Sequence, residues 1–290
     1  MKFRQLVTAI LLATTVSSGP AVARSMEQRR AALVVTIRRQ VRAETLKADD
    51  AQLSRALGAL AAVPREEFVP PEYRRYAYES QMSLPIGYDQ TISDPYVVAL
   101  MTAAANLPDD ANVLDVGTGS GYQAAVLAKI ARRVTSIEIV EPLATSARER
   151  LARLGYGNVE VRAGDGYAGA PDRAPFDAII VAAGSDKVPQ ALVDQLRVGG
   201  RIVMPVGATW ASEQILVMTK TGPTTLDTCS LGWAMFVPLT GRGQRPPWAR
   251  GMLNQDIRLC YGDAVVSPVF VRKLPQPEKV RSRRRKGIAE

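Results

Sequence analysis

Runs of apolar residues alternate with helical or irregular stretches through the middle of this 290-residue chain. Residues 176–184 are apolar almost throughout, as is typical of a parallel strand buried on both faces. Further strands are predicted at 113–116, 133–138, 159–165 and 196–206, the last with a turn at its Gly-Gly pair, and a helix is predicted over 122–131. This alternation predicts an α/β fold with a doubly wound, mostly parallel sheet.

The N-terminal part has a different periodicity. Leu33, Ile37 and Val41 recur every four residues within the stretch 26–62, which predicts helical structure with one buried side. Arginine pairs interleave with these apolar positions and are expected to face solvent rather than a partner. The sheet is therefore expected to carry an N-terminal helical addition.

The stretch 113–122, Val-Leu-Asp-Val-Gly-Thr-Gly-Ser-Gly-Tyr, places three alternate glycines directly after a short strand. Glycine permits a tight turn and close approach of a ligand to the backbone. The spacing is that of neither a dinucleotide site nor a phosphate loop, and the acid before the glycines would repel a pyrophosphate. An amine and a sulfonium suit that acid, so S-adenosyl-L-methionine is the predicted cofactor. The candidate ligands here are Asp115, Gly117, Thr118, Gly119, Ser120 and Gly121.

Two further acids follow at the ends of the next predicted strands. Glu138 lies 23 positions after Asp115, where a doubly wound fold places a carboxylate against ribose hydroxyls. Asp165, followed by Gly166, is placed to accept a hydrogen bond from the adenine amino group. Each segment alone fits an ordinary α/β framework, but their order along the chain favours a cofactor site.

The segment 84–96 precedes this core and combines prolines, a glycine and hydroxyl or amide side chains. It leads into a predicted helix at 97–105, with Ser93 near the N-terminus and Pro95 at the start. Backbone donors and a hydroxyl at a helix N-terminus favour an anion, so a substrate carboxylate is predicted there. The alternative is that Ser93 only caps the helix.

Several segments of this chain, spread over 26–240, resemble the protein-L-isoaspartate (D-aspartate) O-methyltransferase family. They are Ala-Val-Pro-Arg-Glu at 62–66, Phe-Val-Pro at 68–70, Ala-Tyr-Glu at 77–79, Leu-Pro-Ile-Gly at 84–87, Gln-Thr-Ile-Ser at 90–93, the glycine loop, Ser-Ile-Glu at 136–138, Gly-Asp-Gly at 164–166, the stretch 199–207 and Phe-Val-Pro-Leu-Thr at 236–240.

The resemblance implies a Rossmann-like, S-adenosyl-L-methionine-dependent methyltransferase fold. It also implies methylation of the carboxyl group of L-isoaspartyl and D-aspartyl residues in damaged proteins, which initiates their repair. Ser93 corresponds to the residue that the family associates with catalysis, and Thr91, Ser93 and Val237 are the implied substrate contacts. Asp89 and Met235 depart from the family's usual residues, which bears on peptide preference rather than on reaction type.

The chain contains no histidine, which excludes a histidine base, a Ser-His-Asp triad and histidine-bearing metal sites. Methyl transfer to a carboxylate needs none of these, because a carboxyl group that titrates near pH ~4 is already ionised at neutral pH. Two alternatives stay open: a non-catalytic exported relative that binds altered peptide, and a methyltransferase of another carboxylate.

Residues 1–23 have the layout of a secretory signal: Lys2 and Arg4, an apolar stretch, and Ala-Val-Ala before a predicted cleavage after Ala23. The apolar stretch is shorter than the about 20 residues that span a bilayer. An exported, periplasmic protein is predicted, with a cytoplasmic one as the alternative. No transmembrane segment is expected in the mature chain, which we expect to be a monomer.

Residues 241–290 form a predicted extension that follows a methyltransferase domain at 26–240. It starts with a linker-like stretch and ends in a basic run at 279–286, read as a solvated terminus. The formal charge of +9 predicts weak attraction to polyanions, but no aromatic interleaving indicates a specific nucleic-acid site. Cys229 and Cys260, the two cysteines, could form one disulfide in an oxidising compartment.

Overall fold

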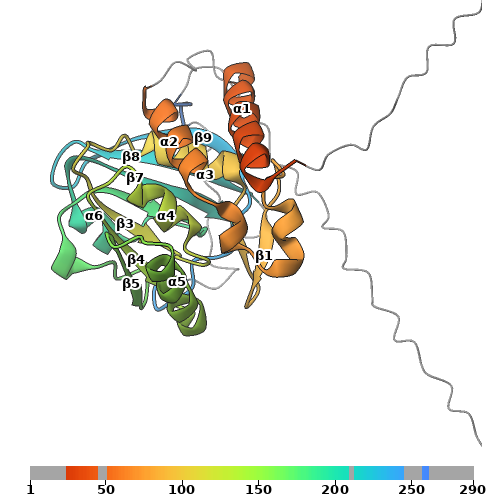
Figure 1. Cartoon of the computed structure of the whole chain (residues 1–290). Coiled ribbons are helices and arrows are strands. Elements are labelled where there is room, and N and C mark those ends of the chain that lie inside the picture. The colour runs from red at the N-terminus through yellow and green to blue at the C-terminus, as the bar shows by residue number, and fades with distance from the viewer. Residues whose placement is uncertain (1–23, 45–50, 209–211, 245–256, 261–290) are drawn as a thin grey trace, which may run out of the picture.

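A computed structural model of the chain describes residues 24–44, 51–208, 212–244 and 257–260. The predicted signal segment 1–23 and the basic run 279–286 lie outside these residues, as does most of the predicted extension. Helices pack against both faces of a central sheet, and a small hairpin lies beside it (Figure 1). The predicted doubly wound α/β fold is confirmed.

The central sheet has seven strands in the order β5-β4-β3-β6-β7-β8-β9. Pairings from β5 to β7 are parallel, and β8 pairs antiparallel with both β7 and β9. The order reverses between β3 and β6, where the chain crosses to the other half of the sheet. The strands are β3 (Asn112–Val116), β4 (Arg133–Glu138), β5 (Val159–Ala163), β6 (Phe176–Val181), β7 (Leu196–Ala208), β8 (Ser212–Lys220) and β9 (Leu226–Ala234).

The sequence suggested a turn at the Gly199-Gly200 pair, but the pair forms no separate turn in the structure. It lies inside β7, where the pairing with β6 shifts from Phe176–Leu196 to Ala178–Arg201. Gly199 has a φ of +80°, and a side chain at Gly200 would lie 2.8 Å from the Asp177 carbonyl. The two glycines therefore accommodate an irregularity within one strand.

The helical parts differ from the predicted bounds at their ends. The stretch 26–62 contains two helices, described up to residue 44 and from residue 51, and the helix expected to reach 131 ends at 128. The helix predicted from 97 begins at Pro95. The helices are α1 (Met26–Glu44), α2 (Ala51–Ala62), α3 (Pro95–Ala104), α4 (Tyr122–Ala128), α5 (Glu141–Arg153) and α6 (Gln190–Gln195), with short 3₁₀ turns at Arg65–Phe68, Pro71–Tyr76 and Pro171–Arg173.

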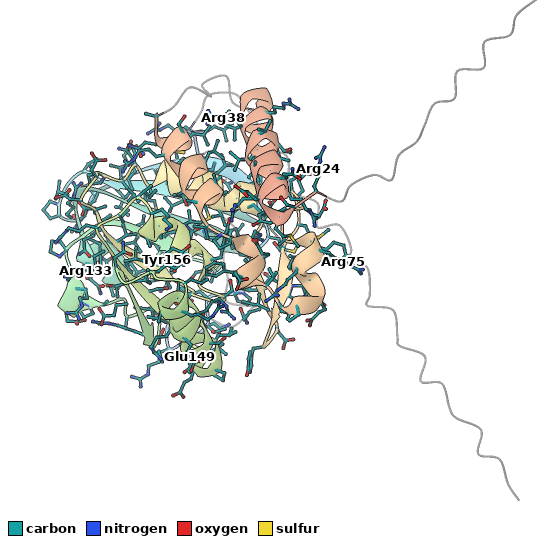
Figure 2. The ribbon with its side chains drawn as sticks, viewed as in Figure 1. Arg24, Arg38, Arg75, Arg133, Glu149 and Tyr156 are labelled. Carbon is teal, nitrogen blue, oxygen red and sulfur yellow. A yellow bond between two sulfur atoms is a disulfide. The ribbon has the colours of Figure 1, made fainter. Side chains whose placement is uncertain are left out.

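Two hydrophobic clusters fill the space on the two faces of the sheet. Because strand side chains alternate between faces, Val113 joins the cluster packed by α1 to α4, and Leu114 joins the cluster packed by α6. Charged side chains such as Arg38 of α1 and Glu149 of α5 lie at the periphery (Figure 2). The hairpin of β1 (Leu84–Gly87) and β2 (Gln90–Ile92) precedes α3.

One edge of the sheet, strand β5, carries a cluster of paired charges. Arg162 lies 2.9 Å from Glu160 and 2.7 Å from Asp172. Arg173 contacts the same two carboxylates, at 2.9 Å and 3.6 Å. These arginines lower the pKa of both Glu160 and Asp172, mainly through hydrogen bonds to the ionised carboxylates.

The other edge, strand β9, is covered in part by residues 257–260. Cys229 and Cys260 form a disulfide across 31 positions of sequence. Ser230 bridges Leu259, with two backbone hydrogen bonds of 2.9 Å, Ser230 N to Arg258 O and Cys260 N to Ser230 O. The possible disulfide considered from the sequence is thus present, and it fastens this segment to the sheet.

Candidate active site

A cavity of about 760 Å³, counted with the open solvent at its mouth, lies at the carboxyl ends of the parallel strands. Its walls come from the β3–α4 loop, the end of β4, the residues after β6, the segment 90–93 and the segment 237–240. This is the point where the strand order reverses, the usual ligand site of a doubly wound sheet.

The predicted glycine loop forms one wall of the cavity. Gly117, Gly119 and Gly121 have φ of +90°, +51° and +89°, in the left-handed region that other residues avoid. A side chain at Gly119 would lie 3.1 Å from Ile86 of the hairpin, and one at Gly121 would lie 3.1 Å from Leu151 of α5. The sequence interpretation is confirmed as to conformation: the loop requires glycine for its turn and for close packing.

Asp115 lies behind this loop and does not line the cavity. Ser136 Oγ donates to Asp115 Oδ2 at 2.7 Å and lies 2.6 Å from Thr118 Oγ1, which does line the cavity. Burial, offset in part by the Ser136 bond, raises the pKa of Asp115 to about 7. Within the described residues Oδ1 of Asp115 has no hydrogen-bond partner. Asp115 is therefore linked to the cavity through the hydroxyls of Ser136 and Thr118 and does not line it.

Glu138 lines the cavity at the end of β4, where the sequence placed a ribose ligand. Its Oε2 accepts from Gly119 N at 2.7 Å, and its Oε1 accepts from Val140 N at 2.9 Å. Each carboxylate oxygen has a second lone pair for a further donor. Glu138 thus fixes the glycine loop while its carboxylate borders the cavity.

Asp165 is differently placed from its neighbour Gly166. Gly166 lines the cavity, but Asp165 does not. The Asp165 carboxylate accepts from two backbone amides, Tyr167 N at 2.9 Å and Arg242 N at 2.8 Å. Its predicted contact with adenine stays a prediction, and in this structure the side chain fastens the segment after 240 to the end of β5.

A second, smaller cavity adjoins the first, and four residues line both: Thr91, Ser93, Ala182 and Val237. Three of them are the substrate contacts implied by the sequence. Met235, which is 53% exposed, and Phe236 complete an apolar side of the second cavity. The four shared residues therefore mark the boundary at which a ligand in one cavity meets a ligand in the other.

The backbone around Val237 is held by two buried groups that sequence reasoning missed. Gly184 N donates to Val237 O at 2.8 Å, and Gly184 O accepts from Leu239 N at 2.7 Å. The buried Glu213 carboxylate accepts from Phe236 N at 3.3 Å, and a side chain at Gly184 would lie 2.6 Å from its Oε1. The alternation of apolar and polar residues along a strand gives no sign that a carboxylate is buried, so the sequence did not single out Glu213. Gly184 was recognised only as the end of a predicted strand.

The capping alternative for Ser93 is wrong. Asp94 is the N-cap of α3, and its Oδ1 accepts from Tyr96 N at 2.9 Å. Because an acid already occupies this helix end, the dipole is satisfied without an external anion. Within the described residues no hydrogen bond engages Ser93 Oγ, so the hydroxyl is available at the junction of the two cavities.

Comparison with known proteins gives one consistent family. Residues 38–244 match the family described as protein-L-isoaspartate(D-aspartate) O-methyltransferase. A protein-L-isoaspartate O-methyltransferase from Polaromonas sp. is 48% identical over 209 residues, covering 72% of this chain and 98% of that protein. The corresponding protein of Gloeobacter violaceus is 48% identical over 197 residues, covering 68% of this chain and 95% of its own length.

Solved structures agree with the fold. A protein-L-isoaspartate O-methyltransferase superposes with a TM-score of 0.65 at 27% identity, covering 74% of this chain and 67% of that one. A beta-aspartate methyltransferase from Plasmodium falciparum, solved with S-adenosyl-L-homocysteine, superposes with a TM-score of 0.60 at 23% identity, covering 73% of this chain and 98% of that one.

Within the described residues, no helix has the length and hydropathy to span a bilayer.

Proposed function

Since this chain belongs to the protein-L-isoaspartate(D-aspartate) O-methyltransferase family, we propose that its larger cavity holds the methyl donor and its smaller cavity the damaged residue. Its activity is S-adenosyl-L-methionine-dependent methylation of the carboxyl group of isoaspartyl residues, the step that begins protein repair. The observation that carries the assignment of sites is the set of four residues common to both cavities.

The larger cavity fits S-adenosyl-L-methionine in its donor set. A loop of left-handed glycines leaves the backbone open to a ligand, and Glu138 offers acceptor positions for ribose hydroxyls. We assign Gly117, Thr118, Gly119, Ser120 and Gly166, which line the cavity, to direct contact with the donor. Gly121 lies off the cavity wall and is assigned to the turn of the loop, and Asp115 to support through Ser136 and Thr118. Asp165 does not line the cavity, and its contact with adenine rests on the sequence alone. The S-adenosyl-L-homocysteine bound in the Plasmodium falciparum structure, the product that remains after methyl transfer, supports a methyl donor of this class.

When bound, S-adenosyl-L-methionine would supply an electrophilic methyl group. An oxygen of the acceptor carboxylate would supply the electron pair of the new O–CH3 bond, and the pair of the broken S–CH3 bond would leave with S-adenosyl-L-homocysteine. The protein has to align the two and exclude water, because the carboxylate is ionised at neutral pH and needs no base. Thr91, Ser93 and Val237 border the junction where that alignment occurs. Ser93 Oγ is proposed to donate to the acceptor carboxylate and orient it towards the donor cavity.

Substitution of Ser93 tests this role. A hydrogen bond to a charged group is worth about 1.5–3 kcal/mol, so Ser93→Ala should lower kcat/KM on an isoaspartyl peptide about tenfold to a hundredfold. Binding of S-adenosyl-L-homocysteine, measured by calorimetry, should stay unchanged. Ser54→Ala, at an exposed serine of α2, is the matched control. Wild-type kinetics in Ser93→Ala would remove Ser93 from the mechanism.

The matched aspartyl peptide separates this activity from methylation of other carboxylates. Transfer of labelled methyl to the isoaspartyl peptide alone supports repair chemistry. Equal transfer to both peptides would favour a broader carboxylate specificity. Donor binding without any transfer would favour the non-catalytic alternative.

We also propose that the protein is exported to the periplasm, with residues 1–23 removed and residues 241–290 as an extension beyond the methyltransferase domain at 26–240. The signal-like layout supports export, and so does the Cys229–Cys260 disulfide, because disulfides persist in oxidising compartments. N-terminal sequencing of the protein from fractionated cells tests this. A periplasmic chain that starts at Arg24 is expected, and a cytoplasmic chain that starts at Met1 would refute export.

A further inference from the structure

Arg65 lies in the 3₁₀ turn after α2, and it is the largest of the fully buried side chains in the described residues. Burial of an arginine is costly unless its charge is compensated and its donors are used. The turn is on no wall of either cavity, so Arg65 touches neither proposed ligand. Its neighbours, however, are residues of the proposed reaction centre.

The guanidinium of Arg65 contacts two of these neighbours. Arg65 Nη2 donates to the backbone carbonyl of Ser93 at 2.8 Å. The same group lies over the ring of Tyr122, 4.7 Å from the ring centroid, and Tyr122 lines the donor cavity as the first residue of α4. One buried cation thus joins the serine at the junction of the cavities to the end of the glycine loop.

Burial lowers the pKa of Arg65, and Tyr122 and Asp94, the residue after Ser93, act in the opposite direction. Within the described residues Nε and Nη1 of Arg65 have no hydrogen-bond partner. Asp94 is 3% exposed, and its Oδ1 accepts from Tyr96 N at 2.9 Å and Gln81 N at 3.3 Å. Burial raises the pKa of Asp94, while these amides and the charge of Arg65 act in the opposite direction. Arg65 and Asp94 form no direct ion pair in the described part of the chain. Arg65 acts on Asp94 through its charge and hydrogen-bonds the carbonyl of the preceding residue, Ser93.

A purely stabilising role does not explain an arginine at this position. Buried ionic groups are often replaced by apolar residues of similar volume without loss of stability, so burial alone favours an apolar side chain. What an apolar residue cannot supply is a donor to the Ser93 carbonyl. That bond fixes the peptide of Ser93, a residue that lines both cavities.

We propose that Arg65 is a positioning residue for methyl transfer. By donating a hydrogen bond to the Ser93 carbonyl, it sets the direction of the Ser93 hydroxyl at the junction of the donor and acceptor cavities. This inference rests on the proposed role of Ser93. Arg65 therefore acts on the alignment of the acceptor carboxylate and not on the affinity for the donor. Lysine in its place retains a charge but lacks the planar fork that reaches Ser93 and stacks on Tyr122.

The test is a double-mutant cycle of Arg65→Lys and Ser93→Ala in the full chain. Methyl transfer to an isoaspartyl peptide gives kcat and KM, and calorimetry gives the dissociation constant of S-adenosyl-L-homocysteine. Arg55→Lys is the matched control, because Arg55 of α2 also donates to backbone carbonyls, those of Leu107 and Ile130, but lines neither cavity. Arg65→Met is the second variant at the site, and melting temperatures are measured for all.

We expect Arg65→Lys to lower kcat about tenfold in the wild-type background and less than about twofold in Ser93→Ala, with donor affinity unchanged. Arg65→Met should lower kcat at least as far whatever its melting temperature, whereas Arg55→Lys should leave kcat unchanged. Equal losses of kcat in both backgrounds, or a loss that follows donor affinity, would overturn the positioning role. Full activity of the Ser93→Ala single variant would instead refute the role proposed for Ser93, and the positioning role with it.

Discussion

Reduction of the Cys229–Cys260 disulfide should release residues 257–260 from strand β9 without unfolding the sheet. The disulfide closes 31 positions of sequence, for which the chain-entropy treatment gives a closure cost of about 3.7 kcal/mol at 25 °C. While the bond is intact this cost is already met by the covalent link. After reduction, the free energy of the contacts that residues 257–260 make with the rest of the protein has to offset this closure cost.

Those contacts are few. The two backbone hydrogen bonds with Ser230 contribute about 1 kcal/mol each. The pair of Arg258 with Asp227, at 2.6 Å and with both side chains more than half exposed, contributes about 0–1 kcal/mol. Half-buried Ile257 adds about 1 kcal/mol. The sum of about 3–4 kcal/mol equals the closure cost, so the reduced segment should be attached only part of the time.

Hydrogen exchange of two amides measures the effect. A change of 3.7 kcal/mol corresponds to about a 500-fold loss of protection at Cys260 N and Ser230 N after reduction and alkylation. Amides of β8, in the interior of the sheet, should keep their protection, and the melting temperature should change by no more than a few degrees. Unchanged protection of Cys260 N in the reduced protein would show that contacts, not closure, hold the segment. A global loss of protection would refute the idea of local release.

Two further predictions concern the donor cavity. In Gly166→Ala the new methyl would lie 2.5 Å from Val116 Cγ1 and 3.3 Å from Leu239 Cδ1. We therefore expect the free energy of unfolding to fall by about 1–3 kcal/mol and the donor to bind more weakly in calorimetry. Gly157→Ala, whose methyl meets no atom within 4 Å, is the control and should change neither quantity. Burial raises the pKa of Asp115 to about 7 from an unfolded value near 4, so the folded protein holds one more proton than the unfolded chain between these pH values. The contribution of Asp115 to the free energy of unfolding should therefore fall as pH rises through this window and level off above it. Asp115→Asn should remove that slope in melting temperatures from pH 4.5 to 8, and an identical slope in both proteins would show that Asp115 does not cause it.

The elements that the sequence predicted well are those in which one signal dominates. Apolar runs located the parallel strands because a strand buried on both faces needs apolar residues at every position. The alternate glycines located the loop, since their positive φ angles permit few other residues. The order of these segments along the chain then favoured a cofactor site, and the structure places the cavity where the strand order reverses.

The details that were missed depend on tertiary packing. Arginine is mostly found at protein surfaces, and only the fold shows that Arg65 is buried and donates to the Ser93 carbonyl. Asp115 precedes the glycines as a ligand would, but its side chain lies behind the loop because Ser136 on the neighbouring strand takes its hydrogen bond. The capping role went to Asp94 rather than Ser93, a difference of one residue that propensities alone do not resolve.

The charge cluster on strand β5 bears on whether an unfolded chain can pair with this edge of the sheet. An unfolded polypeptide carries unpaired backbone groups that can add to the open edge of a sheet as an extra strand. On β5, the edge strand, Glu160 and Arg162 lie two positions apart and therefore on the same face. Arg173 pairs with Glu160, and Asp172 pairs with Arg162. A further strand at β5 would have to break or desolvate these pairs. In the proposed arrangement a damaged chain enters at the carboxyl ends of the strands, and the paired charges disfavour its addition to the β5 edge as a further strand.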